Sequence, residues 1–266
     1  MPMLTIAVSS LSGGQGKTTA TLFLGRMLAQ QGYTVLLIDA DPQASLTTYL
    51  GHEVEAHSPT LLELIKKTVP IEDTIYSVEA HENLFLIPAD DALNGVQDYL
   101  SASGVGATLL KHRLELIGKE FQVCLIDSPP QRTQISLTTI GAAVRLVIPC
   151  ETTVKGFGSL VRTLDLVTTL KEVKATSAEI LGVLPFRDRW IGMNQASESR
   201  MIVEGMVEEV GKELVLPSIR ESERYKQALN KRVSVTELGY PDLEYPFEVL
   251  SKKIVSLLEG VTCQIS

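Results

Sequence analysis

Cysteine is scarce in this chain, and long apolar runs are missing from it. The 266 residues include three cysteines, Cys124, Cys150 and Cys263, and no two of them are spaced as C-x-x-C. A metal cluster held by paired, exposed cysteines is therefore excluded, and Cys124 and Cys150 are expected to fill apolar strands as small hydrophobes. This cysteine usage is typical of a reducing cytoplasm.

No apolar run approaches the roughly 18 residues that span a bilayer, and the N-terminus lacks the pattern of a cleaved leader, so we expect a soluble protein without membrane insertion. Internal repeats and long Gly, Ser or Pro linkers are also missing. With 44% hydrophobic residues to bury, residues 1–266 are expected to form a single domain. The formal charge of −8 argues against a basic surface throughout, so any contact with nucleic acid must come from a local patch.

Six short apolar runs alternate with helical patterns along the chain. Parallel strands buried on both faces have this appearance, because helices cover each side of the sheet. The sequence therefore predicts an α/β fold, a doubly wound and mostly parallel sheet flanked by helices, with ligands bound beyond the carboxyl ends of its strands. The runs are 4–8, 35–38, 84–87, 121–126, 144–148 and 180–184.

The segment 9–19 follows the first of these runs, leads into the helical pattern 20–30, and reads Ser-Ser-Leu-Ser-Gly-Gly-Gln-Gly-Lys-Thr-Thr. Glycines let successive amides turn inward, and the following helix presents its positive end to the same point. We interpret it as a phosphate-binding loop, in which Lys17 approaches the β- and γ-phosphates and the Thr18 hydroxyl binds Mg²⁺. The alternative is a glycine-rich strand-to-helix turn without a ligand.

This loop departs from the ordinary pattern G-x-x-x-x-G-K-[ST], because Leu11 stands where a glycine is required. It resembles the deviant Walker A box of the ParA/MinD family of P-loop ATPases, with Ser12 in place of the lysine that the family carries before its two glycines. The resemblance implies ATP and Mg²⁺ as cofactors. The residues implied to bind the nucleotide are Ser12, Gly13, Gly14, Gln15, Gly16, Lys17, Thr18 and Thr19.

Two further strands of the pattern end in aspartate. Asp39-Ala-Asp41-Pro-Gln closes the run 35–38, and Asp127-Ser-Pro-Pro closes the run 121–126. By resemblance to the family, Asp39 supports the Mg²⁺ hydration shell, Asp41 orients the attacking water, and Asp127 is the Walker B carboxylate that holds Mg²⁺ through water. The alternatives are a strand-ending Asx turn at Asp41 and an ordinary strand cap at Asp127.

Ser12 cannot supply the positive charge that the family's lysine carries across a nucleotide-sandwich dimer to the partner's phosphates. Our candidate for that charge is Lys155, which follows the fifth apolar run and stands beside glycines that would let its side chain move freely. The alternative is an ordinary solvated lysine near a helix start. Weaker candidates are Arg132, Arg187 and Arg189.

The segment 217–232 contains five basic and two acidic residues and resembles the region through which the family contacts nucleoid DNA without base specificity. A solvated helix with internal charge pairs is the alternative. The resemblance also places Phe186, Arg187 and Pro217 at the walls of the adenine pocket. The candidate DNA contacts are Arg220, Arg224, Lys226, Lys231 and Arg232.

Within the family, the form Ser-Gly-Gly-Gln-Gly-Lys-Thr-Thr is most similar to the McdA subgroup, ATPases that space carboxysomes over the nucleoid. The resemblance implies an ATP-dependent homodimer, nonspecific double-stranded DNA, a cytoplasmic, nucleoid-associated location and a cargo adaptor of the McdB or ParB type that stimulates hydrolysis. The alternatives are a plasmid or chromosome partition ATPase, a metabolic enzyme of the dethiobiotin synthetase type and a membrane-associated relative of MinD. Against the last, Lys252 and Lys253 in the pattern 247–261 are offset by Glu248 and Glu259, so that helix is expected to pack on the sheet.

Overall fold

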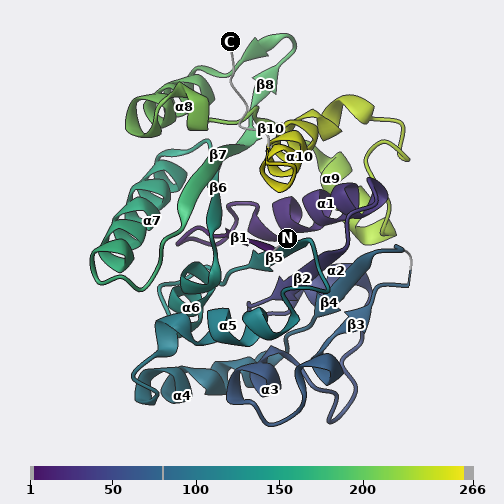
Figure 1. The fold of residues 1–266 in the computed structure, drawn as a ribbon. Helices are drawn as coiled ribbons and strands as arrows, with labels where there is room; N and C mark the ends of the chain where they lie inside the picture. The colour runs from purple at the N-terminus through teal and green to yellow at the C-terminus, as the bar shows by residue number, and fades with distance from the viewer. Residues whose placement is uncertain (1–2, 80, 261–266) are drawn as a thin grey trace.

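The computed structural model describes residues 3–79 and 81–260 (Figure 1). Cys263, and Val261 at the end of the predicted last helix, lie outside the described residues. An eight-stranded sheet has the order β10-β7-β6-β1-β5-β2-β4-β3, and helices lie on both of its faces. All neighbouring strands pair in parallel except β3 and β4. The predicted doubly wound, mostly parallel α/β fold is thus confirmed.

The six predicted strands are all present, and four further short strands were not predicted. Strands β6 and β7 extend past their apolar runs to polar ends, while the additional strands of two residues each are too short for an apolar period to reveal. The strands are β1 (Leu4–Val8), β2 (Val35–Asp39), β3 (Tyr76–Ser77), β4 (Leu84–Ile87), β5 (Val123–Asp127), β6 (Arg145–Glu151), β7 (Glu179–Asp188), the β8 (Trp190–Ile191) and β9 (Asn194–Gln195) hairpin, and β10 (Ile219–Arg220).

Several helices begin at a side chain that caps their first amides. Thr60 forms a capping box with Glu63 at α3, and Thr133 and Thr153 cap α6 and α7. The helices are α1 (Lys17–Gln30), α2 (Ser45–Leu50), α3 (Leu61–Lys66), α4 (Val96–Ala102), α5 (Gly106–Leu114), α6 (Gln134–Ala142), α7 (Val154–Glu172), α8 (Ser197–Val210), α9 (Glu223–Lys231) and α10 (Tyr245–Leu258).

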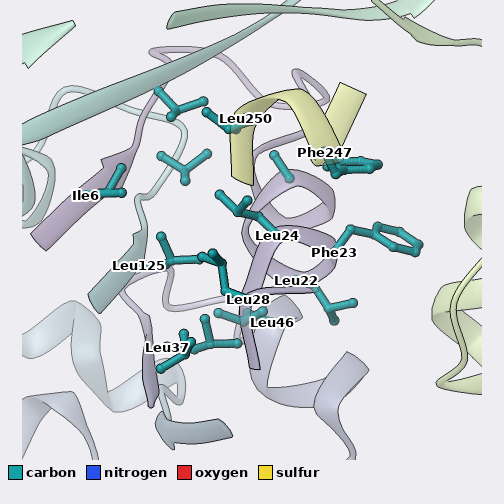
Figure 2. Close-up of a cluster of buried hydrophobic side chains, with 14 of the residues drawn as sticks. Ile6, Leu22, Phe23, Leu24, Leu28, Leu37, Leu46, Leu125, Phe247 and Leu250 are labelled. Atoms are coloured by element: carbon teal, nitrogen blue, oxygen red, sulfur yellow. The ribbon is translucent and has the colours of Figure 1, made fainter. Parts of the chain in front are cut away.

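The strands alternate their side chains between two hydrophobic cores, one on each face of the sheet. Leu37 and Leu125 belong to the core under α1 and α10 (Figure 2). Ile38 and Ile126 belong to the core on the opposite face. This alternation explains why each strand is a continuous apolar run rather than an alternating one.

Helix α10 buries Phe247, Leu250 and Ile254 in the first of these cores, whereas Leu257 is exposed. Phe247 is fully buried and stacks on Phe23 of α1 with ring centroids 5.3 Å apart, which confirms that the helix packs within the fold. In the described part of the chain, no helix combines the length and apolar character needed to cross a membrane. Cys124 in β5 and Cys150 in β6 are free and buried, as predicted.

Candidate functional site

Strand β1 and helix α1 are joined by a tight loop that lies at the carboxyl edge of the sheet. Gly14 and Gly16 have φ angles of +79° and +92°, in the region that favours glycine. A Cβ atom at Gly16 would also overlap the ring of Phe186 from β7. No side chain caps α1, so the amides of its first turn are left for another acceptor. This is the backbone geometry of an anion cradle.

A cavity of about 540 Å³ opens in front of this loop. Of the predicted nucleotide-binding residues, Gly13 to Thr19, Phe186 and Arg187 line it, and Asp41 faces it from the β2 side. Pro217 lines a neighbouring cavity of about 620 Å³ instead, which shares Arg220 and Tyr225 with the first. Neither Ser12 nor Lys155 is among the residues that line the loop cavity.

Lys17 is almost completely buried, and its Nζ donates a hydrogen bond of 3.0 Å to the carbonyl oxygen of Ser12. Burial lowers the pKa of Lys17, while the nearby carboxylates of Asp127 and Asp41 act in the opposite direction. Lys17 also lines the cavity, so its buried ammonium is well placed to meet an anionic ligand there.

The parallel register brings Asp39 and Asp127 side by side, because the last residues of β2 and β5 are direct partners. Thr18 donates a hydrogen bond of 2.6 Å to Asp127 Oδ2, whereas Asp127 Oδ1 is buried and has no hydrogen-bond partner among the described residues. Burial, followed by the charge of Asp39, raises the pKa of Asp127 well above its ordinary value. An uncompensated buried carboxylate of this kind is costly unless a cation joins it.

The carboxylate of Asp39 has its hydrogen bonds from within the chain. Thr47 of α2 donates its amide at 2.9 Å and its hydroxyl at 2.8 Å to Oδ2, and Asp41 N donates to Oδ1 at 3.2 Å. Burial raises the pKa of Asp39 to about 6, and the bonds from Thr47 reduce that shift. Sequence reasoning missed Thr47, since nothing in the spacing shows that α2 turns back on β2.

Lys155 lies in the first turn of α7 rather than in a free loop. Its side chain is exposed, and within the described residues it makes no hydrogen bond or ion pair. The idea that flanking glycines give it freedom is wrong for Gly156, which is buried and packs so closely that a Cβ there would overlap the carbonyl oxygen of Glu151.

Arg162 of α7 was not predicted to lie near the loop. Its Nη2 lies 3.4 Å from Ser12 Oγ, at the position where the family carries its lysine. It stands seven residues after Lys155, which is two helical turns, so both side chains lie along one face of α7. Two cations therefore line the helix that flanks the loop.

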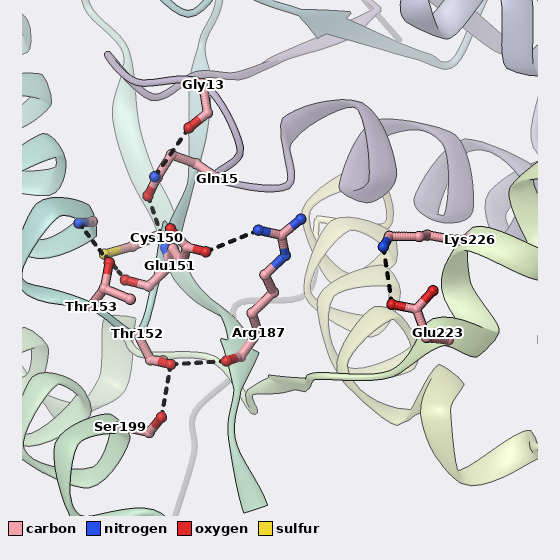
Figure 3. A network of polar contacts seen from close by, with 11 residues as sticks. Gly13, Gln15, Cys150, Glu151, Thr152, Thr153, Arg187, Ser199, Glu223 and Lys226 are labelled. Atoms are coloured by element: carbon pink, nitrogen blue, oxygen red, sulfur yellow. Dashed lines mark hydrogen bonds and ion pairs between the residues drawn. The ribbon is translucent and has the colours of Figure 1, made fainter.

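The five candidate DNA residues do not form one continuous basic stripe. Arg220 stacks on Trp190 at 4.4 Å and Arg224 on Tyr240 at 4.5 Å, measured from the guanidinium carbon to the ring centroid. Lys226 forms a 3.0 Å ion pair with Glu223 (Figure 3), as the alternative of internal charge pairs expected. Exposed Lys231 makes no hydrogen bond or ion pair in the described part of the chain, and Arg232 ends α9 beside Gly51.

The fold and the site together define a P-loop nucleotide-binding protein of the ParA/MinD type. A family model described as an AAA domain matches residues 3–179. The maintenance of carboxysome distribution protein A (McdA) of Gloeothece citriformis is 54% identical over 246 residues, which cover 92% of this chain and 95% of that protein. Its counterpart in Synechococcus elongatus is 52% identical over 252 residues, covering 95% and 99%.

The structure of an McdA variant from Cyanothece in complex with ATP superposes with a TM-score of 0.92 at 51% identity, covering 99% of both chains. The chain therefore belongs to the McdA family of ParA-type ATPases.

Proposed function

We propose that this protein is a Mg²⁺-dependent ATPase that forms a sandwich homodimer with ATP, binds nucleoid DNA nonspecifically and positions carboxysomes through an adaptor of the McdB or ParB type, which stimulates hydrolysis. The observation that carries the proposal is the meeting of the phosphate loop with Asp41 and Asp127 at one sheet edge. Similarity to McdA over more than nine-tenths of the chain supports the cargo, and the ATP complex of a relative supports the ligand.

In this proposal the triphosphate lies in the cavity in front of the loop. The amides from Ser12 to Gly16 and those of Lys17, Thr18 and Thr19 would surround its oxygens, and Lys17 would place its charge between the β- and γ-phosphates. Phe186 and Arg187 would form the walls for adenine, with Pro217 reached from the adjoining cavity.

The oxygen atoms at the end of β5 fit Mg²⁺. In the part of the chain that the structure describes, the buried Asp127 Oδ1 has no hydrogen-bond partner, and the Thr18 hydroxyl lies against the other carboxylate oxygen. Thr18 would bind the ion directly, while Asp127 and Asp39 would act through water, because Mg²⁺ keeps much of its hydration. The bound ion would neutralise charge that develops on the transferred phosphoryl group.

Asp41 is the group we propose to orient the attacking water. Its Oδ1 accepts the amide of Gln43 at 3.0 Å, which fixes the carboxylate at the rim of the cavity. Phosphoryl transfer depends mainly on positioning and electrostatics, so a fixed acceptor for the protons of water is a sufficient device.

Lys155 is proposed to supply the charge that Ser12 lacks by reaching the phosphates of the partner subunit. Lys155 is exposed and makes no hydrogen bond or ion pair with the residues that the structure describes, and the neighbouring Val154 is 74% exposed; these observations support a role at an interface. The dimer would then combine its basic residues on DNA, among them Arg220, Arg224, Lys226, Lys231 and Arg232, and the protein would be cytoplasmic and nucleoid-associated.

We propose that residues 1–266 form a single domain, and the test uses all of them. Light scattering with Mg²⁺ and ATP should report a dimer, and with ADP in place of ATP it should report a monomer. In a gel, the protein should retard arbitrary duplex DNA with ATP and not with ADP. Slow hydrolysis without any other substrate should accompany these results. A monomer under all conditions, or hydrolysis only with a small-molecule substrate, contradicts the proposal and favours a metabolic enzyme.

A further inference from the structure

Gln15 is a buried polar side chain within the phosphate loop, and it turns from the loop toward strand β6. It is 1% exposed, and its Oε1 accepts the amide hydrogen of Glu151 at 2.8 Å (Figure 3). Its Nε2 donates to the carbonyl oxygen of Gly13 at 3.4 Å. Because a buried amide side chain without partners is costly, these two bonds fix Gln15 in one orientation. The loop and the end of β6 are therefore joined through one side chain.

The end of β6 leads at once into the first turn of α7, which carries Lys155. Thr153 caps that turn by accepting the amide of Gly156 at 3.2 Å. A Cβ at Gly156 would overlap the Glu151 carbonyl oxygen and would lie 3.1 Å from Gln15 Oε1. The first turn of α7 thus rests directly on the glutamine and on the backbone that the glutamine holds.

The body of α7 is attached to the loop by separate contacts. Ser159 Oγ lies 3.0 Å from Ser10 Oγ, and Thr163 Oγ1 accepts the amide of Leu11 at 3.2 Å. Both hydroxyl-bearing residues are fully buried. Loss of the Gln15 contact would consequently leave the helix docked and release only its first turn.

The cavity wall holds the same short segment from its other side. Arg187 forms a 3.0 Å ion pair with the Glu151 carboxylate (Figure 3). Thr152 N donates to the Phe186 carbonyl oxygen at 2.9 Å. The orientation of the segment toward the loop therefore depends on Gln15, and its attachment to β7 does not.

We propose that Gln15 is a positioning residue, which sets the direction of the first turn of α7 and so aims Lys155 at the phosphates of the partner subunit. This inference rests on the proposed function of Lys155. The loop would then enclose the triphosphate and also orient Lys155. Binding of the phosphates by the loop and presentation of the lysine would be coupled.

The test replaces the glutamine by a side chain of similar length that cannot accept the amide bond, Gln15→Met. Gln122→Met is the matched control, because Gln122 Oε1 also accepts a backbone amide, that of Thr34 at 3.0 Å, at the opposite edge of the sheet. For Gln15→Met we expect Mg·ATP affinity within about threefold of wild type, but ATP-dependent dimerisation and kcat reduced about tenfold or more. The control should match wild type in all three.

A double variant decides whether the effect passes through the lysine. Gln15→Met combined with Lys155→Ala should be no worse than Lys155→Ala alone, since the two changes remove one interaction. Multiplied losses, wild-type behaviour of Gln15→Met, or loss of ATP affinity as large as that of Lys17→Ala would each overturn the inference. Gly156→Ala tests the same contact from the helix and should reproduce the Gln15→Met result, also where Gln15→Met fails to fold. If wild type itself does not dimerise with ATP, the proposed function fails first, which is a separate result.

Discussion

Charged side chains at the sheet edge and on helix α9 are held in opposite ways. Lys17 and Asp127 are buried and have pKa values shifted by burial; Lys17 donates a hydrogen bond to the Ser12 carbonyl, and Asp127 accepts one from Thr18. Lys226 and Glu223 form an ion pair whose side chains are 63% and 76% exposed. Exposed pairs contribute little because water screens them, whereas buried charges contribute strongly through whatever ligand compensates them. Substitutions at the edge should therefore have much larger effects than those on α9.

The largest effect should come from Lys17→Ala. It removes the only ammonium buried in the loop among the described residues, and we expect Mg·ATP affinity to fall at least about a hundredfold. Isothermal titration calorimetry measures this directly. Lys171→Ala, at the exposed end of α7, is the control and should bind as wild type.

Asp41→Ala should separate binding from chemistry. Since the Asp41 carboxylate lies at the cavity rim outside the loop, the variant should keep ATP and the dimer while kcat falls about a hundredfold or more. Phosphate release and light scattering on the same sample give both values. Rapid turnover would remove Asp41 from its assigned role.

Lys155→Ala should affect assembly more than ligand binding. We expect ATP-dependent dimerisation to weaken about tenfold, with ATP affinity of the monomer unchanged, because the exposed Lys155 side chain makes no hydrogen bond or ion pair with the described residues of its own subunit. Sedimentation velocity distinguishes the two. The same measurement on Arg162→Ala shows whether the second cation on α7 shares the task; an unaltered Lys155→Ala dimer would leave Arg162 as the stronger candidate.

Asp127→Asn should stabilise the protein without ligand while it weakens Mg²⁺ binding. The raised pKa of Asp127 means that the folded state holds its proton to higher pH than the unfolded state does, so its contribution to the free energy of unfolding decreases as pH rises above about 4. At pH 7.5 the variant should exceed wild type by about 1–2 kcal/mol, and near pH 4 the two should converge. Thermal unfolding at both pH values checks the sign of the stability difference between the variant and wild type. With Mg·ATP present, wild type should become the more stable of the two.

Lys231→Ala should have the smallest effect, and it allows this lysine to be compared with a paired one, Lys226, on the same helix, α9. Lys231 is unpaired within the described residues, so its loss should lower the salt dependence of DNA binding by about one unit of slope, with a few-fold loss of affinity. Lys226→Ala should do less, because that ammonium is shared with Glu223. Fluorescence anisotropy at several salt concentrations measures both, with Lys119→Ala as the control at the opposite sheet edge.

The loop and the strand-end carboxylates were predictable because each directly follows an apolar run. Parallel strands end at one edge, and a residue that ends a strand cannot move far from it, so the positions of Asp39 and Asp127 follow from their place in the pattern. The contacts of Thr47, Arg162 and Gln15 were not predictable in this way. The first two depend on how a helix packs over the edge, and the third on how the loop folds against the end of β6, neither of which apolar spacing specifies.

By itself, the sequence determined the parallel sheet, the phosphate loop and the acidic residues beside it, since local spacing and short connections dictate them. Only the tertiary structure decided which partners the polar and charged side chains take: that Arg220 and Arg224 rest on aromatic rings, that Asp39 is bonded to Thr47, and that Gln15 is bonded to the end of β6. These contacts join residues far apart in the chain, and their geometry exists only once the helices have packed on the sheet.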